Sequence, residues 1–317
     1  MKSFSINRLA VKVVEELKRK PNYYGIKVQE GTPTIIDAGV KAKGGYSAGK
    51  LITEISMGGC AKVELTLKKY EDLQLPAVQV YTDFPVIATM GSQLASWRIK
   101  EGDYNAIGSG PARALALHPK SMYQKIGYQD DYNQGVALLE TAQYPPAEVT
   151  AKLAEDCGIP HENLTVILTP TSSLSGATQI SGRIVETGIH KLAELNFDLD
   201  VIQHACGYAP IPPLHPKFMN SMGRTNDAIL YGGVAYYSVR HPDDEKLEEI
   251  VQQAPSQSSQ VCGKPFLEIF KEADYDFYKI DNKLFAPAVV TINNLDTGRT
   301  FTTGKINVET LKKSLAL

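Results

Sequence analysis

The chain has 317 residues, of which 43% are hydrophobic and 21% are charged, as in ordinary globular proteins. A single hydrophobic core rarely extends beyond roughly 250–300 residues, so this length favours two domains. Lys and Arg number 33 against 35 Asp and Glu, which leaves a net charge of -2. This charge excludes the broad cationic field that a nucleic acid or an anionic membrane would need, so any anion site must be local.

The sequence carries no signal for a membrane segment, a disulfide framework or a metal site. No segment approaches ~20 consecutive apolar residues. Lys12, Glu15 and Glu16 interrupt the N-terminal stretch, which predicts a helix rather than a signal peptide. The four cysteines form no CxxC pair, which favours reduced thiols in the cytosol. The six histidines show no HxH or HExxH spacing, so we expect no zinc or iron hydrolase site.

Extended and helical patterns alternate along the first half of the chain. Leu9, Val13 and Leu17 form one apolar stripe and predict a helix over residues 6–19. Apolar and polar residues alternate over 62–67, which is typical of a half-buried antiparallel strand. The other elements expected in this half are strands at 25–29, 34–38, 77–82, 103–107 and 136–140 and helices at 47–56 and 146–156.

The second half continues this alternation. The longest helix is expected over 178–195, and residues 228–239 are interpreted as a strand interrupted by Gly232 and Gly233. Further strands are expected at 164–168, 201–206, 288–293 and 300–304, and further helices at 243–252 and from 307. Strands and helices mixed in this way predict an α/β protein of the α+β type, with two domains of mixed, largely antiparallel sheets and flanking helices. The expected domains are residues 1–105 with 287–317, and residues 106–286.

The clearest candidate site is the turn Gly108-Ser109-Gly110, which is followed by Pro111 and Arg113. Two glycines let the backbone approach a ligand closely, and Pro111 suits the start of a helix. The N–H groups of such a turn, with Arg113 one turn into the helix, would bind an anion. The alternative is a tight strand-to-helix turn without a ligand, and the pattern leaves both open.

A second polar cluster is Gly223-Arg224-Thr225-Asn226-Asp227. It is followed directly by an apolar run, so it could form the floor of a cleft at the start of a buried strand. The alternative is a surface turn with an Asn or Asp cap. The sequence favours neither.

Four polar residues share one face of the expected long helix. Gln179, Arg183, Glu186 and His190 are spaced by four, three and four residues. A solvated face with a weak Arg–Glu pair, worth ~0.3 kcal/mol, is one interpretation. In the other, the face lines a cleft, where the Arg holds a water molecule and the Glu takes its proton.

Aromatic residues accompany these groups. They are Tyr81, Phe84, Trp97, Tyr104 and Phe285. A flat heteroaromatic ligand would stack on such rings, although each ring taken singly is more often part of a core.

Taken together, these stretches resemble the methenyltetrahydromethanopterin cyclohydrolases along essentially the full length of the chain. The matching runs are long and peculiar to that family: KAKGGYSAGKLITEISMGG, LPAVQVYTDFPV, GDYNAIGSGPARALAL, QISGRIVETGIHKL, MGRTNDAILYGG, GKPFLEIFKEADYDFYKID and FAPA. The resemblance implies reversible hydrolysis of 5,10-methenyltetrahydromethanopterin to 5-formyltetrahydromethanopterin in one-carbon metabolism, in methanogenesis or its reverse. It also implies a cytoplasmic homotrimer with an active-site cleft between two domains and with no metal or redox cofactor.

The resemblance also assigns roles to residues. The family's catalytic Arg-x-x-Glu pair maps to Arg183 and Glu186. Arg113 and Arg224 are expected to bind the phosphate and glutarate of the substrate tail. The full expected substrate-binding set is Gly108, Ser109, Gly110, Arg113, Gln179, Arg224, Thr225, Asn226, Asp227, Phe84 and Phe285.

Two rival functions remain. One is a pterin- or nucleotide-binding protein without catalysis, which would have the same pockets. The other is a cyclohydrolase acting on a folate analogue. The folate enzymes use a Rossmann-type dinucleotide domain and a catalytic Lys, and the lone GSG of this chain is no GxGxxG fingerprint.

Overall fold

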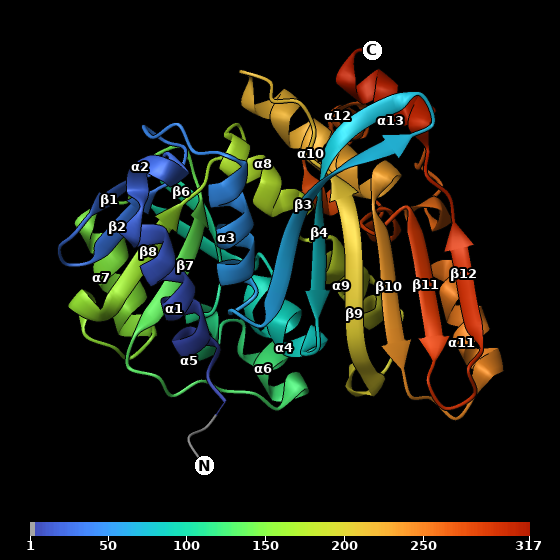
Figure 1. Ribbon diagram of the computed structural model, residues 1–317, viewed down its shortest axis with the longest axis horizontal. Helices are drawn as coiled ribbons and strands as arrows, with labels where there is room; N and C mark the ends of the chain where they lie inside the picture. Colours follow the sequence, from blue (N-terminus) through green and yellow to red (C-terminus); the bar gives the residue numbers. More distant parts are fainter. Residues whose placement is uncertain (1–3) are drawn as a thin grey trace. The chain divides into compact units, whose positions relative to one another are not determined.

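The computed structural model describes residues 4–317, and these form two compact units. Unit 1 takes the described chain up to Lys62 together with Val86–Gln179, and unit 2 takes Val63–Pro85 together with Ile180–Leu317. Within the described residues each unit has one mixed sheet of six strands (Figure 1), which confirms the predicted α/β class. The expected domains, 1–105 with 287–317 and 106–286, stay a prediction; their bounds differ from those of the units.

The sheet of unit 1 has the strand order β1-β2-β8-β7-β6-β5. The three strands β2, β8 and β7 are parallel to one another, whereas β1, β6 and β5 each pair antiparallel with a neighbour. The strands are β1 (Lys27–Gln29), β2 (Thr34–Asp37), β5 (Trp97–Glu101), β6 (Tyr104–Ser109), β7 (Gly135–Glu140) and β8 (Leu164–Leu168).

The central strands of unit 1 are buried on both faces, because successive side chains of a strand point to opposite sides. Val136 and Leu138 of β7 belong to the core that α1 and α3 form, and Ala137 and Leu139 belong to the core of α7. The helices of this unit are α1 (Ile6–Arg19), α2 (Pro21–Tyr24), α3 (Tyr46–Ser56), α4 (Pro85–Ala88), the π-helix η1 (Thr89–Gln93), α5 (Ala112–Ala116), α6 (Lys120–Ile126), α7 (Ala147–Asp156), η2 (His161–Asn163) and α8 (Leu174–Ser181).

The sheet of unit 2 has the strand order β12-β11-β10-β9-β4-β3. Its β10 and β11 are parallel, and the pairs β12/β11, β10/β9 and β9/β4 are antiparallel. The strands are β3 (Ala61–Tyr70), β4 (Leu73–Thr82), β9 (Ile202–Pro210), β10 (Val234–Val239), β11 (Val289–Asn294) and β12 (Thr300–Gly304).

Helices of unit 2 pack on this sheet and on one another. α9 contacts β9 and β10, α11 contacts β11 and β12, and α10 packs against α12 and α13 (Figure 1). The helices are α9 (Ile184–Glu194), η3 (Leu199–Val201), α10 (Phe218–Gly232), α11 (Asp244–Gln253), η4 (Ser256–Ser258), α12 (Phe266–Glu272), η5 (Phe277–Lys279), η6 (Asn282–Leu284) and α13 (Val308–Leu315).

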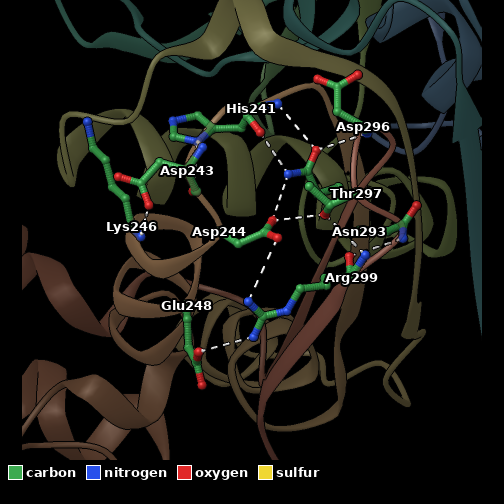
Figure 2. A network of polar contacts seen from close by, with 10 residues as sticks. His241, Asp243, Asp244, Lys246, Glu248, Asn293, Asp296, Thr297 and Arg299 are labelled. Carbon is green, nitrogen blue, oxygen red and sulfur yellow. Dashed lines mark hydrogen bonds and ion pairs between the residues drawn. The ribbon is translucent and has the colours of Figure 1, made fainter.

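A polar network joins the C-terminal end of β11 to the first turn of α11. Asn294, fully buried at the end of β11, donates from Nδ2 to the His241 carbonyl at 2.8 Å and to Asp244 Oδ1 at 2.7 Å. Thr297 donates to the same Asp244 oxygen, and Arg299 lies 3.8 Å from the other (Figure 2). Asp244 stands in the first turn of α11, where a negative charge is favourable. The network therefore fixes α11 to the sheet.

The structure corrects two sequence predictions. The helix expected over 178–195 is two helices, because Gly182 and Arg183 leave the helical conformation between α8 and α9. The strand expected over 228–239 begins only at Val234, and the preceding residues belong to α10. A short apolar run cannot be assigned to a buried helix or a buried strand by periodicity alone, which explains the second error.

Candidate active site

The start of α9 brings together the two residues expected to be catalytic. Arg183 is the N-cap residue of α9, with φ -81° and ψ 6°, and Glu186 lies in the first turn. Both side chains are largely buried, at 7% exposure each. The carboxylate of a first-turn Glu interacts favourably with the N-terminal end of the helix dipole. The pair therefore lies at a helix terminus rather than along an exposed helical face.

The first turn of α9 lies unusually close to the sheet of unit 2. Ile184 is fully buried, and a Cβ atom added to Gly233, just before β10, would lie 2.5 Å from Ile184 Cδ1. Such a distance is well inside van der Waals contact. Gly233 therefore makes room for the side chain of the residue that follows Arg183.

The C-terminal half of α9 is held by a buried cation. Lys191 is 2% exposed, and its Nζ donates to Ser258 Oγ at 3.1 Å and to the Lys283 carbonyl at 3.0 Å. Burial lowers the pKa of Lys191, which the charge of Asp281 partly offsets. This contact ties α9 to η4 and η6, and Phe285 is the C-cap residue of η6. The sequence analysis did not single out Lys191, because one lysine in an amphipathic helix gives no signal.

The predicted stripe along one helix is wrong in part. Gln179 is fully buried in α8 and is the last residue of unit 1, whereas Arg183 and Glu186 belong to unit 2. Only Glu186 and His190 keep the four-residue spacing within one helix, α9. The break at Gly182 and Arg183 is the physical reason, since the residues on either side of it belong to different helices.

Gly108 and Ser109, expected in a turn, are the last residues of β6; Gly110 and Pro111 join this strand to α5, which contains Arg113. Arg113 is fully buried, with Nε 3.0 Å from the His118 carbonyl and Nη1 at 3.1 and 3.2 Å from the Met90 and Ser92 carbonyls. Met90 and Ser92 belong to the π-helix η1. Arg113 therefore binds backbone carbonyls with these three hydrogen bonds. This favours the interpretation of a tight strand-to-helix turn without a ligand, which the sequence left open.

The second polar cluster is neither a loop nor a surface turn, because residues 223–227 lie inside α10. Arg224 donates to the carbonyls of Pro213, Leu214 and Leu315 at 3.0–3.3 Å. Asn226 Nδ2 donates to the Met222 carbonyl at 2.9 Å, and Thr225 Oγ1 donates to the same oxygen at 3.0 Å. Consecutive helical residues point about 100° apart, so the cluster cannot face a single ligand.

Arg224 and Asp227 nevertheless line one cavity of about 260 Å³, together with residues of α12 and α13 such as Lys271 and Lys313. Asp227 is 1% exposed and accepts from the Phe266 N–H at 2.7 Å and from Ser314 Oγ at 2.5 Å. Burial raises the pKa of Asp227 to about 7. Asp227 thereby connects α10 to the first residue of α12 and to α13.

The two aromatic residues of the predicted site lie in different parts of unit 2. Phe285 belongs to an aromatic group, with its ring centroid 5.9 Å from that of Phe266 and 6.4 Å from that of Phe277. Phe84 follows β4 and is 46% exposed. Both rings have a surface that a flat ligand could contact, although Phe285 is half-buried.

Two kinds of feature are absent from residues 4–317. In that part of the chain, no group of three or more His, Cys, Asp or Glu residues is arranged to hold a metal ion. No helix among the described residues is long and apolar enough to cross a membrane.

Comparison with known proteins identifies the relatives of this chain. A family model described as Cyclohydrolase (MCH) matches residues 5–315. The chain is 45% identical to a protein named methenyltetrahydromethanopterin cyclohydrolase from Methanocaldococcus jannaschii, with 98% of each chain covered. Proteins with the same name from Methanothermobacter marburgensis and Methanospirillum hungatei are 45% and 43% identical, with 99% and 98% of each chain covered.

Proposed function

Since the chain belongs to the Cyclohydrolase (MCH) family and is thus a hydrolase, we propose that it catalyses the reversible hydrolysis of 5,10-methenyltetrahydromethanopterin to 5-formyltetrahydromethanopterin. Full-length relatives that carry the name of this reaction support the substrate. The observation that carries the mechanism is the placement of Arg183 and Glu186 at the start of α9, both largely buried. The reaction would serve one-carbon metabolism, in methanogenesis or its reverse.

The substrate itself supplies the electrophile. Its methenyl carbon lies between two nitrogens in a delocalised cation, so it needs no Lewis acid to accept water. Water adds to this carbon and loses one proton to a base, which gives a neutral carbinolamine. N10 then takes a proton while its bond to the carbon breaks, and the hydroxyl loses its proton to become the formyl oxygen. The balance is one water consumed and one proton released.

Glu186 suits both proton transfers in this proposal. One carboxylate can take the proton of the water and return it to N10, because acid and base roles alternate in the two steps. Arg183 stands three residues before it, and a planar guanidinium can hold a carboxylate and a water together. The partial burial of both side chains strengthens these interactions relative to bulk water. Arg183 would orient the pair without exchanging a proton itself.

The tail of the substrate would be bound elsewhere on the chain. Of the two arginines expected to meet its anions, Arg224 lines a cavity whereas Arg113 is fully buried. We therefore propose Arg224 as the first candidate for the phosphate or glutarate. Roles in binding for Gln179, Phe84 and Phe285 and for the Gly108-Ser109-Gly110 turn remain part of the proposal.

Turnover tests this function directly. Loss of the methenyl chromophore on mixing enzyme and substrate distinguishes an enzyme from a pterin-binding protein, and the same assay with methenyltetrahydrofolate tests the folate alternative. Glu186→Gln should lower turnover by roughly 10²–10⁴-fold, the range of general acid–base catalysis, with substrate still bound. Glu194→Gln is the matched control, because Glu194 is an exposed residue at the end of the same helix. Near-parent turnover in Glu186→Gln would contradict the acid–base role.

The assembly and its requirements complete the proposal. We expect a cytoplasmic homotrimer that needs neither a metal ion nor a redox cofactor, as the sequence resemblance implies. Light scattering of the purified protein gives the oligomeric state. Turnover measured before and after dialysis against a strong chelator tests the metal independence, and a loss that added metal restores would refute it.

A further inference from the structure

A buried tyrosine of β10 forms a hydrogen bond to the first turn of α9. Tyr237 of β10 is fully buried, and its hydroxyl donates to the carbonyl of Val185 at 3.0 Å. Val185 directly precedes Glu186 in the first turn of α9. A carbonyl in a helix has a second lone pair available for such a bond. The hydroxyl therefore fixes the distance between β10 and the backbone of α9 at Val185, the residue next to Glu186.

The position of this hydroxyl depends on a glycine two residues after Glu186. A Cβ atom at Gly188 would overlap the Tyr237 hydroxyl oxygen and would lie 2.9 Å from the ring carbon Cζ. It would also lie 3.2 Å from Cγ of Pro287. Any larger residue at 188 must therefore lift α9 from β10 or displace the tyrosine. Val185 before Glu186 and Gly188 after it therefore both contact the same side chain, Tyr237.

Tyr237 is a neutral hydrogen-bond donor and not a proton carrier. Burial raises its pKa well above the ordinary value, and the nearby charge of Glu186 raises it further. The phenol therefore stays protonated at neutral pH.

We propose that Tyr237 is a positioning residue for Glu186, acting through its hydrogen bond to the Val185 carbonyl. This proposal rests on the acid–base role proposed for Glu186. A catalytic group must be held within a fraction of an ångström of its productive position, and a displacement of 1 Å can cost about 10²-fold in rate. Without the hydroxyl, the first turn of α9 loses the hydrogen bond that positions the backbone next to Glu186.

The first test removes only the hydroxyl. Tyr237→Phe keeps the ring and its packing, and the Val185 carbonyl keeps its place in the helix. We expect kcat to fall about tenfold while KM changes less than about twofold, because a smaller displacement of the base affects the chemical step more than binding. Tyr236→Phe is the matched control, since Tyr236 is the preceding residue of β10 and points to the opposite face, where it is 36% exposed. It should retain the parent's kcat and KM.

A double-mutant cycle separates positioning from packing. In the Glu186→Gln background the base is absent, so adding Tyr237→Phe should lower the residual kcat less than about twofold. Gly188→Ala should lower kcat on its own, and the loss should be smaller when Tyr237→Phe is also present, because the atom that clashes most is then gone. Circular dichroism of each variant verifies that it is folded.

Three results would overturn the positioning role. They are a parent-like kcat in folded Tyr237→Phe, an equal loss from Tyr237→Phe with and without Glu186, and no relief of Gly188→Ala by Tyr237→Phe. Failure of the proposed function looks different, because Glu186→Gln itself would then turn over normally. If Glu186→Gln is inactive and Tyr237→Phe is normal, only the positioning proposal is wrong.

Discussion

Arg113 in unit 1 and Arg183 in unit 2 have similar surroundings in the sequence but different ones in the structure. Each follows a glycine within three residues and stands near the start of a helix. Arg113 is fully buried and donates to three backbone carbonyls. Arg183 caps α9 and stands one turn before a largely buried carboxylate. A glycine beside an arginine therefore indicates a tight backbone and does not by itself indicate a ligand.

The groups near the two arginines explain the difference in their expected roles. Backbone carbonyls are fixed acceptors, and an arginine that serves three of them connects segments of chain, here α5 to the π-helix η1. A carboxylate can gain and lose a proton, so an arginine beside it can influence chemistry. The comparison predicts that substitutions of Arg183 mainly affect turnover and that substitutions of Arg113 mainly affect stability.

The largest effect is expected for Arg183→Lys. Lysine keeps the charge but loses the planar fork that can hold a carboxylate and a water together. Turnover should fall roughly 10²–10³-fold, as when a single preorganised donor is removed from an active site. The free energy of unfolding should change little in comparison, because lysine keeps the positive charge at this position. Arg240→Lys, at an exposed pair with Asp296, is the control. If Arg183→Lys is fully active, the guanidinium of Arg183 does not orient the water or Glu186.

The second prediction concerns Arg113→Met, which has a similar length and no donors. The buried carbonyls of Met90, Ser92 and His118 would lose their bonds to the guanidinium, at a cost of roughly 2–4 kcal/mol. A fall in Tm of roughly 5–15 °C should follow. The folded protein should keep its KM. A selective rise in KM for the full substrate, compared with one lacking its phosphate and glutarate, would instead restore the anion-binding role of this turn.

The sequence predicted the elements better than the site. The helix at Ile6–Arg19 and the strands Leu164–Leu168 and Thr300–Gly304 agree with the predicted bounds, because apolar periodicity and turn residues define them locally. The break between α8 and α9 was missed, although Gly182 is a weak signal for it, since an isolated glycine is tolerated inside many helices.

The supporting contacts of the site could not be found from the sequence, because they join segments far apart in the chain. Tyr237 meets Val185 across 52 residues, and Lys191 meets the Lys283 carbonyl across 92. Alternation along β10 places Tyr237 on the inner face, yet nothing in the sequence says which helix lies there. The bonds of Arg113 could not be predicted for the same reason, since two of its three acceptors lie in the π-helix η1.

The third prediction uses Asp227, whose folded pKa is about 7 against an ordinary value of 3.8. The folded protein binds this proton more tightly than the unfolded chain, so the contribution of Asp227 to stability is greatest below pH 4. It declines between about pH 4 and 7 and stays low above pH 7. Asp227→Asn keeps an acceptor for the Phe266 N–H and cannot ionise.

Denaturant unfolding measured from pH 4 to 8 tests this prediction. Asp227→Asn should be more stable than the parent above pH 7, by about 1–3 kcal/mol, and its stability should vary less with pH. Asp276→Asn is a control, because Asp276 caps a short helix at the surface. A variant less stable than the parent at pH 8 would show that the ionised carboxylate stabilises the α10–α12 contact.

The smallest effect is expected for Arg224→Lys, and Arg224 can be compared directly with Arg113. Like Arg113, Arg224 donates to three carbonyls, but it also lines a cavity of about 260 Å³. Lysine can replace only part of the fork, so we expect a loss of about 1 kcal/mol in the free energy of unfolding. The charge remains, so a role in long-range attraction of the substrate tail would leave KM nearly unchanged. Arg224→Met removes the charge as well and should raise KM for the full substrate but not for one without its anionic tail. If KM is unchanged in both variants, Arg224 serves only to join α10 to the chain around Pro213 and Leu315. Arg113 and Arg224 would then both have structural roles.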